Sequence, residues 1–137
     1  MIIHAIQNAY NIAEKRKWDK IYWAIDLHGT ILPPTWSIKN NLIFYPYAKE
    51  TLQLLSSKTG CILILFTCSH AYKIYEYCKF FYNNNIIFKY INNNPEVISN
   101  EYGNYTNKFY FNILLDDKAG FDPNKDWIKI FKLLNKV

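Results

Sequence analysis

The chain has 137 residues, half of them hydrophobic, and a formal net charge of +5. This length favours a single domain with a substantial core, and the lack of a run of about 18 apolar residues argues against a membrane-spanning helix. The mild, dispersed positive charge permits attraction to nucleotides or nucleic acid without indicating it.

Apolar residues recur with a spacing that alternates between helical and extended patterns. We expect helices over residues 2–15, 46–57, 70–82 and 122–134, and strands over residues 21–26, 61–66, 86–90 and 109–115. Asp122 followed by Pro123 predicts the N-cap and first turn of the last helix. The asparagine-rich residues 92–107 and the pair Pro33-Pro34 predict loops.

Alternation of helices and strands is typical of a parallel sheet that is covered by helices. We therefore expect a single Rossmann-like, three-layer α/β/α domain over residues 1–137, with a mainly parallel sheet. Residues 1–18 are expected to form a helix that packs on the core. No internal repeat or linker divides the chain.

The remaining composition bears on the cellular setting. Cys61, Cys68 and Cys78 form no CxxC pair and no signal-peptide pattern opens the chain, so we expect reduced, mostly buried thiols in a cytoplasmic protein. Abundant Lys, Asn, Ile and Tyr, with Arg16 as the single arginine, indicate an A/T-rich bacterial or viral genome. We interpret the tyrosines as core and rim packing rather than as a base-stacking platform.

Two of the predicted strands end in carboxylates. Asp26 ends the first strand, and Asp116 and Asp117 follow the last one. Ligands bind at the carboxyl edge of open α/β sheets, so these acids predict one shared acidic site. The alternative for Asp116 and Asp117 is that they cap a following turn.

Four segments together resemble the motifs of the haloacid dehalogenase-like (HAD) superfamily. Residues 26–30, Asp-Leu-His-Gly-Thr, resemble its first motif, Asp-x-Asp-Gly-Thr. Residues 65–67, Leu-Phe-Thr, resemble the second motif, Lys108 is placed like the third-motif lysine, and residues 114–117, Leu-Leu-Asp-Asp, resemble the fourth. The motifs occur in the family order and span most of the chain, from residue 21 to residue 121.

The resemblance implies a Rossmann-like fold, a Mg²⁺ ion and phosphoryl transfer. Asp26 is then the nucleophile that attacks phosphorus. Because Mg²⁺ prefers oxygen ligands, the expected ligands are the carboxylates of Asp26, Asp116 and Asp117 and the backbone carbonyl of His28. A zinc site at Cys68 and His70 is not expected, because too few matching ligands exist.

The same resemblance assigns the groups that bind the phosphate. Thr67 offers a hydroxyl and a backbone N–H, and Lys108 offers a positive charge to the nucleophile and the transferring group. Gly29 lets the backbone at His28 and Gly29 turn closely enough to present N–H groups to the same oxygens.

His28 stands where most phosphatases of this superfamily have a second aspartate. Histidine is chemically able to act as the general acid and base, because its ordinary pKa lies near working pH. Its presence is equally compatible with a slower phosphatase, a different leaving group, or a protein that keeps the fold and metal site without efficient turnover. The residues alone leave these alternatives open.

Few residues are available for a cap domain. The segments between Thr30 and Thr67 and between His70 and Asn107 are short, so we expect no folded cap and at most a flap over residues 31–45. An open site suits a bulky phosphate monoester, such as a nucleic-acid end or a phosphoprotein, or a site that a partner closes. We expect a Mg²⁺-dependent phosphohydrolase, and the alternative is a catalytically weak binding or assembly module, viral or from the host. The sequence does not indicate an oligomeric state.

Overall fold

The computed structural model describes residues 1–34 and 42–136, which fold into a four-stranded parallel sheet with four helices. The elements are α1 (Ile2–Arg16), β1 (Ile21–Asp26), α2 (Ala48–Ser57), β2 (Cys61–Phe66), α3 (Ala71–Asn83), β3 (Tyr90–Ile91), β4 (Ile113–Leu115), the 3-10 helix η1 (Asp117–Ala119) and α4 (Asp126–Leu134). The strand order is β3-β2-β1-β4, with every pair parallel. The expected α/β fold with a parallel sheet is confirmed. Within the described residues, no helix has the length and apolar character needed to cross a membrane.

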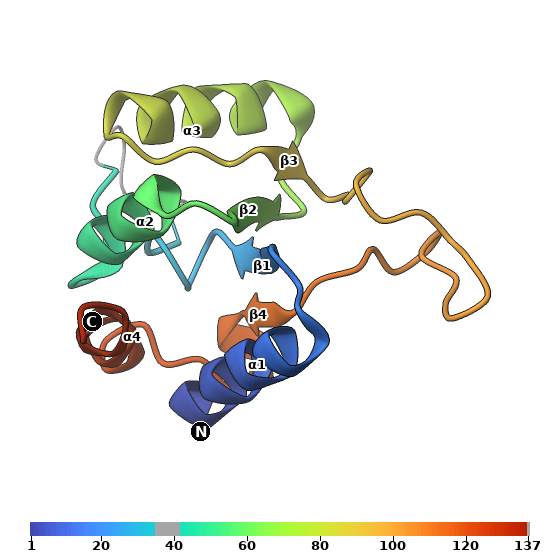
Figure 1. Ribbon diagram of the computed structural model, residues 1–137. Coiled ribbons are helices and arrows are strands. Elements are labelled where there is room, and N and C mark those ends of the chain that lie inside the picture. The colour runs from blue at the N-terminus through green and yellow to red at the C-terminus, as the bar shows by residue number, and fades with distance from the viewer. Residues whose placement is uncertain (35–41, 137) are drawn as a thin grey trace.

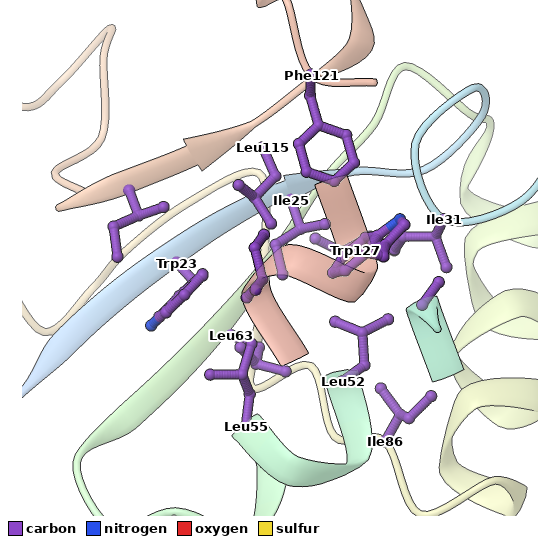
Figure 2. Packing of buried hydrophobic residues seen from close by; sticks show 14 of the residues in the cluster. Trp23, Ile25, Ile31, Leu52, Leu55, Leu63, Ile86, Leu115, Phe121 and Trp127 are labelled. Atoms are coloured by element: carbon purple, nitrogen blue, oxygen red, sulfur yellow. The ribbon is translucent and has the colours of Figure 1, made fainter. Parts of the chain in front are cut away.

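One face of the sheet carries the main hydrophobic core. Side chains alternate between the two faces of a strand, so Trp23 and Ile25 of β1 point to the same side. There they join buried residues from α2 and α4, among them Leu52 and Trp127 (Figure 2). Both tryptophans are completely buried. Helix α1 adds three buried residues to this cluster, Ile6, Ala9 and Ala13.

The opposite face is covered by the segment 92–112, which connects β3 to β4. Figure 1 shows this segment on one side of the sheet and α2 and α4 on the other. Its aromatic rings pack on strand residues of this face, with ring centroids 5.8 Å apart for Phe109 and Phe66 and 6.0 Å apart for Tyr110 and Tyr22. The segment therefore forms an ordered layer, although its secondary structure is irregular.

Two polar residues fix the segment 92–112 in place. Asn94 is only 3% exposed and donates a hydrogen bond to the backbone carbonyl of Tyr110. The carboxylate of Glu96 accepts hydrogen bonds from the hydroxyls of Tyr22 and Tyr90, at 3.1 and 2.6 Å. Both tyrosines belong to strands, so Glu96 ties the segment directly to the sheet.

The predicted start of the last helix was wrong. Helix α4 begins at Asp126, four residues later than Asp122. Asp122 instead organises the preceding turn: its side chain accepts from the N–H of Asn124 at 3.0 Å, and its carbonyl accepts from the N–H of Asp126 at 2.8 Å. An aspartate followed by proline is a good turn former as well as a good cap, and here the turn prevails.

The two outer strands are shorter than predicted. Strand β4 begins at Ile113 rather than at residue 109, because the side-chain oxygen of Asn112 takes the N–H of Tyr22 at 2.7 Å in place of a backbone carbonyl. Strand β3 pairs with β2 only through Tyr90 and Ile91. Single-sequence patterns place strand ends less reliably than strand centres.

The cysteines are less buried than predicted, and the predicted flap lies partly outside the described residues. Cys68 is exposed and Cys61 and Cys78 are half-buried, so the prediction of mostly buried thiols was wrong, and all three are free. The predicted flap over residues 31–45 falls partly on residues 35–41, outside the described residues.

Candidate active site

Three carboxylates meet at the carboxyl edge of the sheet. Strand β1 ends in Asp26, and β4 lies beside it in parallel with Ile25 opposite Leu115, so Asp116 and Asp117 leave β4 at the same edge. One ligand oxygen from each of these three acids lies within 4.8 Å of the others. The structure thus brings together the acids that the strand ends predicted.

Thr30 holds two of these acids in register. Its hydroxyl donates to Oδ2 of Asp26 at 2.9 Å, and it accepts the backbone N–H of Asp117 at 3.0 Å. The threonine is completely buried, and its carbonyl accepts from the indole N–H of Trp127 at 2.7 Å. Thr30 was part of the first motif but received no role from the sequence. Only the fold reveals that Thr30 contacts Asp117, which lies 87 positions further along the chain.

Gly29 is required by the close approach of Asp117. Its φ of 84° lies in the left-handed region, and a Cβ at this position would lie 2.7 Å from Oδ2 of Asp117. No other residue tolerates both conditions without strain. The N–H of Gly29, however, donates to the carbonyl of Leu32 at 2.8 Å, so it is not free for phosphate as predicted. The glycine makes room for an acid rather than binding the phosphate through its own N–H.

The acids are not neutralised by protein cations. Within the described residues, no lysine or arginine forms an ion pair with Asp26, Asp116 or Asp117. Burial, followed by the hydrogen bond that the protonated Asp26 carboxyl donates to Asp117 and by the charges of Asp116 and Asp117, raises the pKa of Asp26 to about 7, against a lowering effect of the Thr30 hydroxyl. Three hard oxygen donors that share excess negative charge are a ligand set that suits Mg²⁺.

His28, two residues after Asp26, is partly buried. Its ring packs edge-on against Tyr77 of α3, with ring centroids 5.3 Å apart. Its Nδ1 is buried and has no hydrogen-bond partner among the described residues. Burial lowers the pKa of His28, so the imidazole is neutral at neutral pH. A neutral imidazole is able to accept a proton but is a poor donor.

Thr67 lies at the end of β2, but its backbone is already engaged. Its N–H donates to Oδ1 of Asn92 at 2.8 Å, and its carbonyl accepts from Nδ2 of Asn92 at 2.8 Å. The predicted role of the Thr67 N–H in phosphate binding therefore does not hold in this arrangement. The Thr67 hydroxyl lies 2.9 Å from the hydroxyl of Ser69.

Asn92 is a site residue that sequence reasoning missed. It holds the loop after β2 from the end of β3, and it adopts a φ of 53°. Asparagine tolerates the left-handed region better than most residues, which is the one signal that the sequence offered. A composition rich in asparagine concealed that signal.

Lys108 is not brought to the acids. It is exposed, and its ammonium lies 5.8 Å from the ring centroid of Phe111. Within residues 1–34 and 42–136, no hydrogen bond or ion pair joins Lys108 to Asp26, Asp116 or Asp117. Its predicted catalytic role has no support from its contacts.

Tyr45 is a neighbour of the site that the sequence did not single out. Its N–H donates to the carbonyl of Ile31 at 3.0 Å, which ties the start of α2 to the loop after β1. Burial, and to a smaller extent the negative charge of Asp117, raises the pKa of the Tyr45 hydroxyl. The Tyr45 hydroxyl therefore lies close enough to Asp117 for the charge of that carboxylate to affect its pKa.

Comparisons with known proteins add the fold but not an activity. No family model matches this chain, and no curated protein matches it significantly. A solved structure of a conserved protein from Bacteroides thetaiotaomicron is similar, with 22% identity and a TM-score of 0.64 over 85% of this chain and 91% of that chain. At this identity the likeness shows that the two chains share a fold.

Proposed function

We propose that this chain is a Mg²⁺-dependent, HAD-like phosphohydrolase that cleaves a phosphate monoester through a phospho-aspartyl intermediate on Asp26. The observation that carries the proposal is the convergence of the Asp26, Asp116 and Asp117 carboxylates within 4.8 Å, without a protein cation among the described residues. Such a cluster raises the electrostatic energy of the folded protein, and a divalent cation relieves that cost.

The three carboxylates and the backbone carbonyl of His28 would hold the metal ion. When bound, Mg²⁺ supplies positive charge that offsets the repulsion between an aspartate nucleophile and a phosphate. The chain's own contribution is orientation. Thr30 engages Oδ2 of Asp26 and leaves the other oxygen to face the substrate, and Gly29 admits Asp117 to the same place.

The proposed reaction has two steps. An oxygen of Asp26 attacks phosphorus, the bond from phosphorus to the ester oxygen breaks, and the leaving oxygen takes a proton from solvent. Water then attacks the phosphorus of the acyl phosphate, a proton of the water passes to His28, the bond from phosphorus to the Asp26 oxygen breaks, and inorganic phosphate leaves. The Thr67 hydroxyl follows β2 at this edge and is suited to a phosphate oxygen.

His28 suits the second step better than the first. A neutral imidazole accepts the proton of the attacking water, but it protonates a leaving oxygen poorly. We therefore expect aryl phosphates, whose leaving group needs no proton, to react faster than alkyl phosphates such as nucleotide ends. With a poor leaving group, the first step limits the rate.

We propose a bulky monoester as the substrate class, with a nucleotide or a nucleic-acid end as the leading candidate. The three free cysteines fit a reducing compartment, so we propose a cytoplasmic location. A second candidate function is a catalytically weak module that binds metal and a partner. The observation that favours it is that Lys108 makes no polar contact with the acids in the described part of the chain.

Hydrolysis of p-nitrophenyl phosphate tests the proposal. The wild-type protein should release p-nitrophenolate with Mg²⁺ and not with EDTA, and Asp26→Asn should lower kcat by at least about 10³-fold, because an amide is not a useful nucleophile. Glu50→Gln, the same chemical change at an exposed site on α2, is the matched control and should leave kcat unchanged. Activity that survives in Asp26→Asn would refute the nucleophile, and an inactive wild type that binds Mg²⁺ would favour the binding module.

A further inference from the structure

A large cleft lies at the opposite end of the sheet from the acids. Its volume is about 720 Å³, which is in the range of small-molecule sites. It opens between the end of α1 and the segment 92–112, near Tyr22 at the start of β1. Asp26 ends the same strand, so the cleft and the candidate active site are separated by most of its length. The lining residues include one acid, Asp19, three cations and five aromatic rings: Arg16, Lys17, Lys20, Trp18, Tyr22, Tyr102, Tyr105 and Tyr110.

Some of the aromatic rings that line the cleft pack against one another, and others are exposed to solvent. Tyr22, Tyr110 and Tyr105 form a ladder of edge-to-face contacts, with successive ring centroids 6.0 and 5.5 Å apart. Trp18 and Tyr102, in contrast, are 39% and 87% exposed. Exposed rings beside a rigid aromatic wall are a platform on which a flat, apolar ring is able to stack. The prediction that tyrosines serve only in packing does not account for Tyr102.

The three cations at this cleft differ in whether they form an ion pair with an acidic residue. Lys20 forms an ion pair with Glu96 at 2.8 Å, so its charge is largely used within the protein. Arg16 and Lys17 form no ion pair within the described residues. The Arg16 guanidinium lies 5.4 Å from the Trp18 ring centroid, which places an uncompensated charge directly beside an exposed ring.

Lys17 occupies a backbone position that glycine ordinarily fills. It has a φ of 56° and ψ of 41° at the end of α1, where its N–H donates to Glu14 and the next N–H, of Trp18, donates to Ala13 at 2.8 Å. This arrangement is the usual helix-ending turn, in which glycine carries no steric cost. Lysine at this position is less favourable for the backbone than glycine, but it places a cation in the lining of the cleft.

We propose that this cleft binds a nucleotide unit, either free or within a single strand. The base stacks on Trp18 and Tyr102, as bases do on aromatic platforms in single-strand binding proteins. Arg16 and Lys17 hold the attached phosphate. The combination of rings and uncompensated cations matches the two halves of a nucleotide, whereas an acidic peptide would use only the cations.

The polar lining indicates that the cleft does not read base identity. The side-chain amide of Asn112 accepts from the N–H of Tyr22 and donates to the hydroxyl of Tyr110. The side-chain oxygen of Asn100 accepts from the N–H of Tyr102 at 2.8 Å. These amide groups are already used, so binding through stacking and phosphate contacts should tolerate all bases.

Fluorescence anisotropy with a labelled oligothymidylate of about ten nucleotides tests the proposal. The titration uses the full chain in about 50 mM salt with EDTA, which removes any Mg²⁺-dependent binding at the acids. Trp18→Leu and Tyr102→Leu should each weaken binding by about tenfold or more. Tyr82→Leu, at an exposed tyrosine of α3 outside the cleft, is the matched control and should bind like the wild type.

Lys17→Gly separates binding from folding. Glycine relieves the left-handed backbone strain, so this variant should melt at the same or a higher temperature than the wild type. It should nevertheless bind more weakly, with a salt dependence reduced by about 0.7 in the slope of log K against log salt. Lys132→Ala, at an exposed lysine of α4, is the control for the loss of one charge.

The outcomes are distinct. Tighter binding of the oligonucleotide than of thymidine monophosphate assigns the cleft to a single strand, and equal binding assigns it to a free nucleotide; both support the proposal. It is overturned if neither probe binds the wild type, if the Trp18 and Tyr102 variants bind like the wild type, or if polyglutamate displaces the oligonucleotide as well as unlabelled oligothymidylate does. Tyr102 is exposed, so its variant carries the test even if Trp18→Leu is unstable.

Discussion

Two carboxylates on the same face of the sheet have pKa values that are shifted in opposite directions. Glu96 packs over Tyr22 near the start of β1. Its pKa is lowered to about 2 by hydrogen bonds from Lys20, Tyr90, Lys89 and Tyr22. Asp26, at the end of β1, has its pKa raised to about 7, chiefly by burial. One carboxylate is fully compensated and secures the fold, and the other is left without compensation. The fold thus concentrates its unfavourable charge at the edge where ligands bind in sheets of this kind.

The compensated carboxylate should give the largest effect on stability. Glu96 is 14% exposed and accepts charged hydrogen bonds from Lys20 and Lys89. Glu96→Ala should lower the free energy of unfolding by about 2 kcal/mol, as measured by urea titration, because it releases the segment 92–112 from the sheet. Glu76→Ala, which breaks a 3.9 Å pair in which the glutamate is 66% exposed, should lower it by less than about 0.5 kcal/mol. An equal loss in both variants would contradict the comparison.

The pH dependence of stability provides an internal check on the role of Glu96. The folded pKa of Glu96 lies below its ordinary value of 4.5, so its stabilisation is complete above that pH and is lost as the pH falls towards 2. Glu96→Gln should lack this part of the acid dependence.

Metal binding should stabilise the uncompensated edge by an intermediate amount. At a Mg²⁺ concentration of ten times the dissociation constant, the free energy of unfolding should rise by about 1.4 kcal/mol, which is detectable as a higher Tm. Asp117→Asn should abolish the rise, and Glu50→Gln should keep it. A Tm that is independent of Mg²⁺ up to high millimolar concentration would remove the proposed metal site.

The smallest effect concerns Asp26 without metal. Its folded pKa of about 7 lies above its ordinary value of 3.8, so the folded protein binds an extra proton between these values and loses stability as the pH rises through them. Asp26→Asn should remove this slope and, at pH 8 in EDTA, be more stable than the wild type by about 1 kcal/mol after allowance for solvent screening. A variant that is less stable than the wild type at pH 8 would show that Asp26 is compensated after all.

The sequence predicted the acids well because their positions depend on local patterns. An apolar run that ends in aspartate places that aspartate at a strand end, and parallel pairing of β1 with β4 places Asp26 and Asp116 at one edge. Lys108 could not be placed in this way, because it lies in the irregular segment 92–112, where no periodicity relates a residue to the sheet.

The residues that organise the site were harder to find. Thr30 and Asn92 act through hydrogen bonds to partners far along the chain or in another loop, and no local pattern encodes such pairs. Whether Asp122 caps the helix or forms a turn was likewise decided by a contact, since its backbone N–H donates to the Asp126 carboxylate at 2.8 Å. Local propensity left both outcomes open, and tertiary structure chose between them.

The link between Thr30 and Asp117 also bears on how the chain acquires its site during synthesis. The two residues are 87 positions apart, and β4 follows β1, β2 and β3 in the chain. Contacts of such long range form late in folding, because the intervening chain must first be ordered. A nascent chain that has paired β1 with β2 still lacks two of the three acids. Binding of a divalent cation at this edge would therefore report that the chain has been made through β4 and that β4 has paired with β1, and it would stabilise only that folded state.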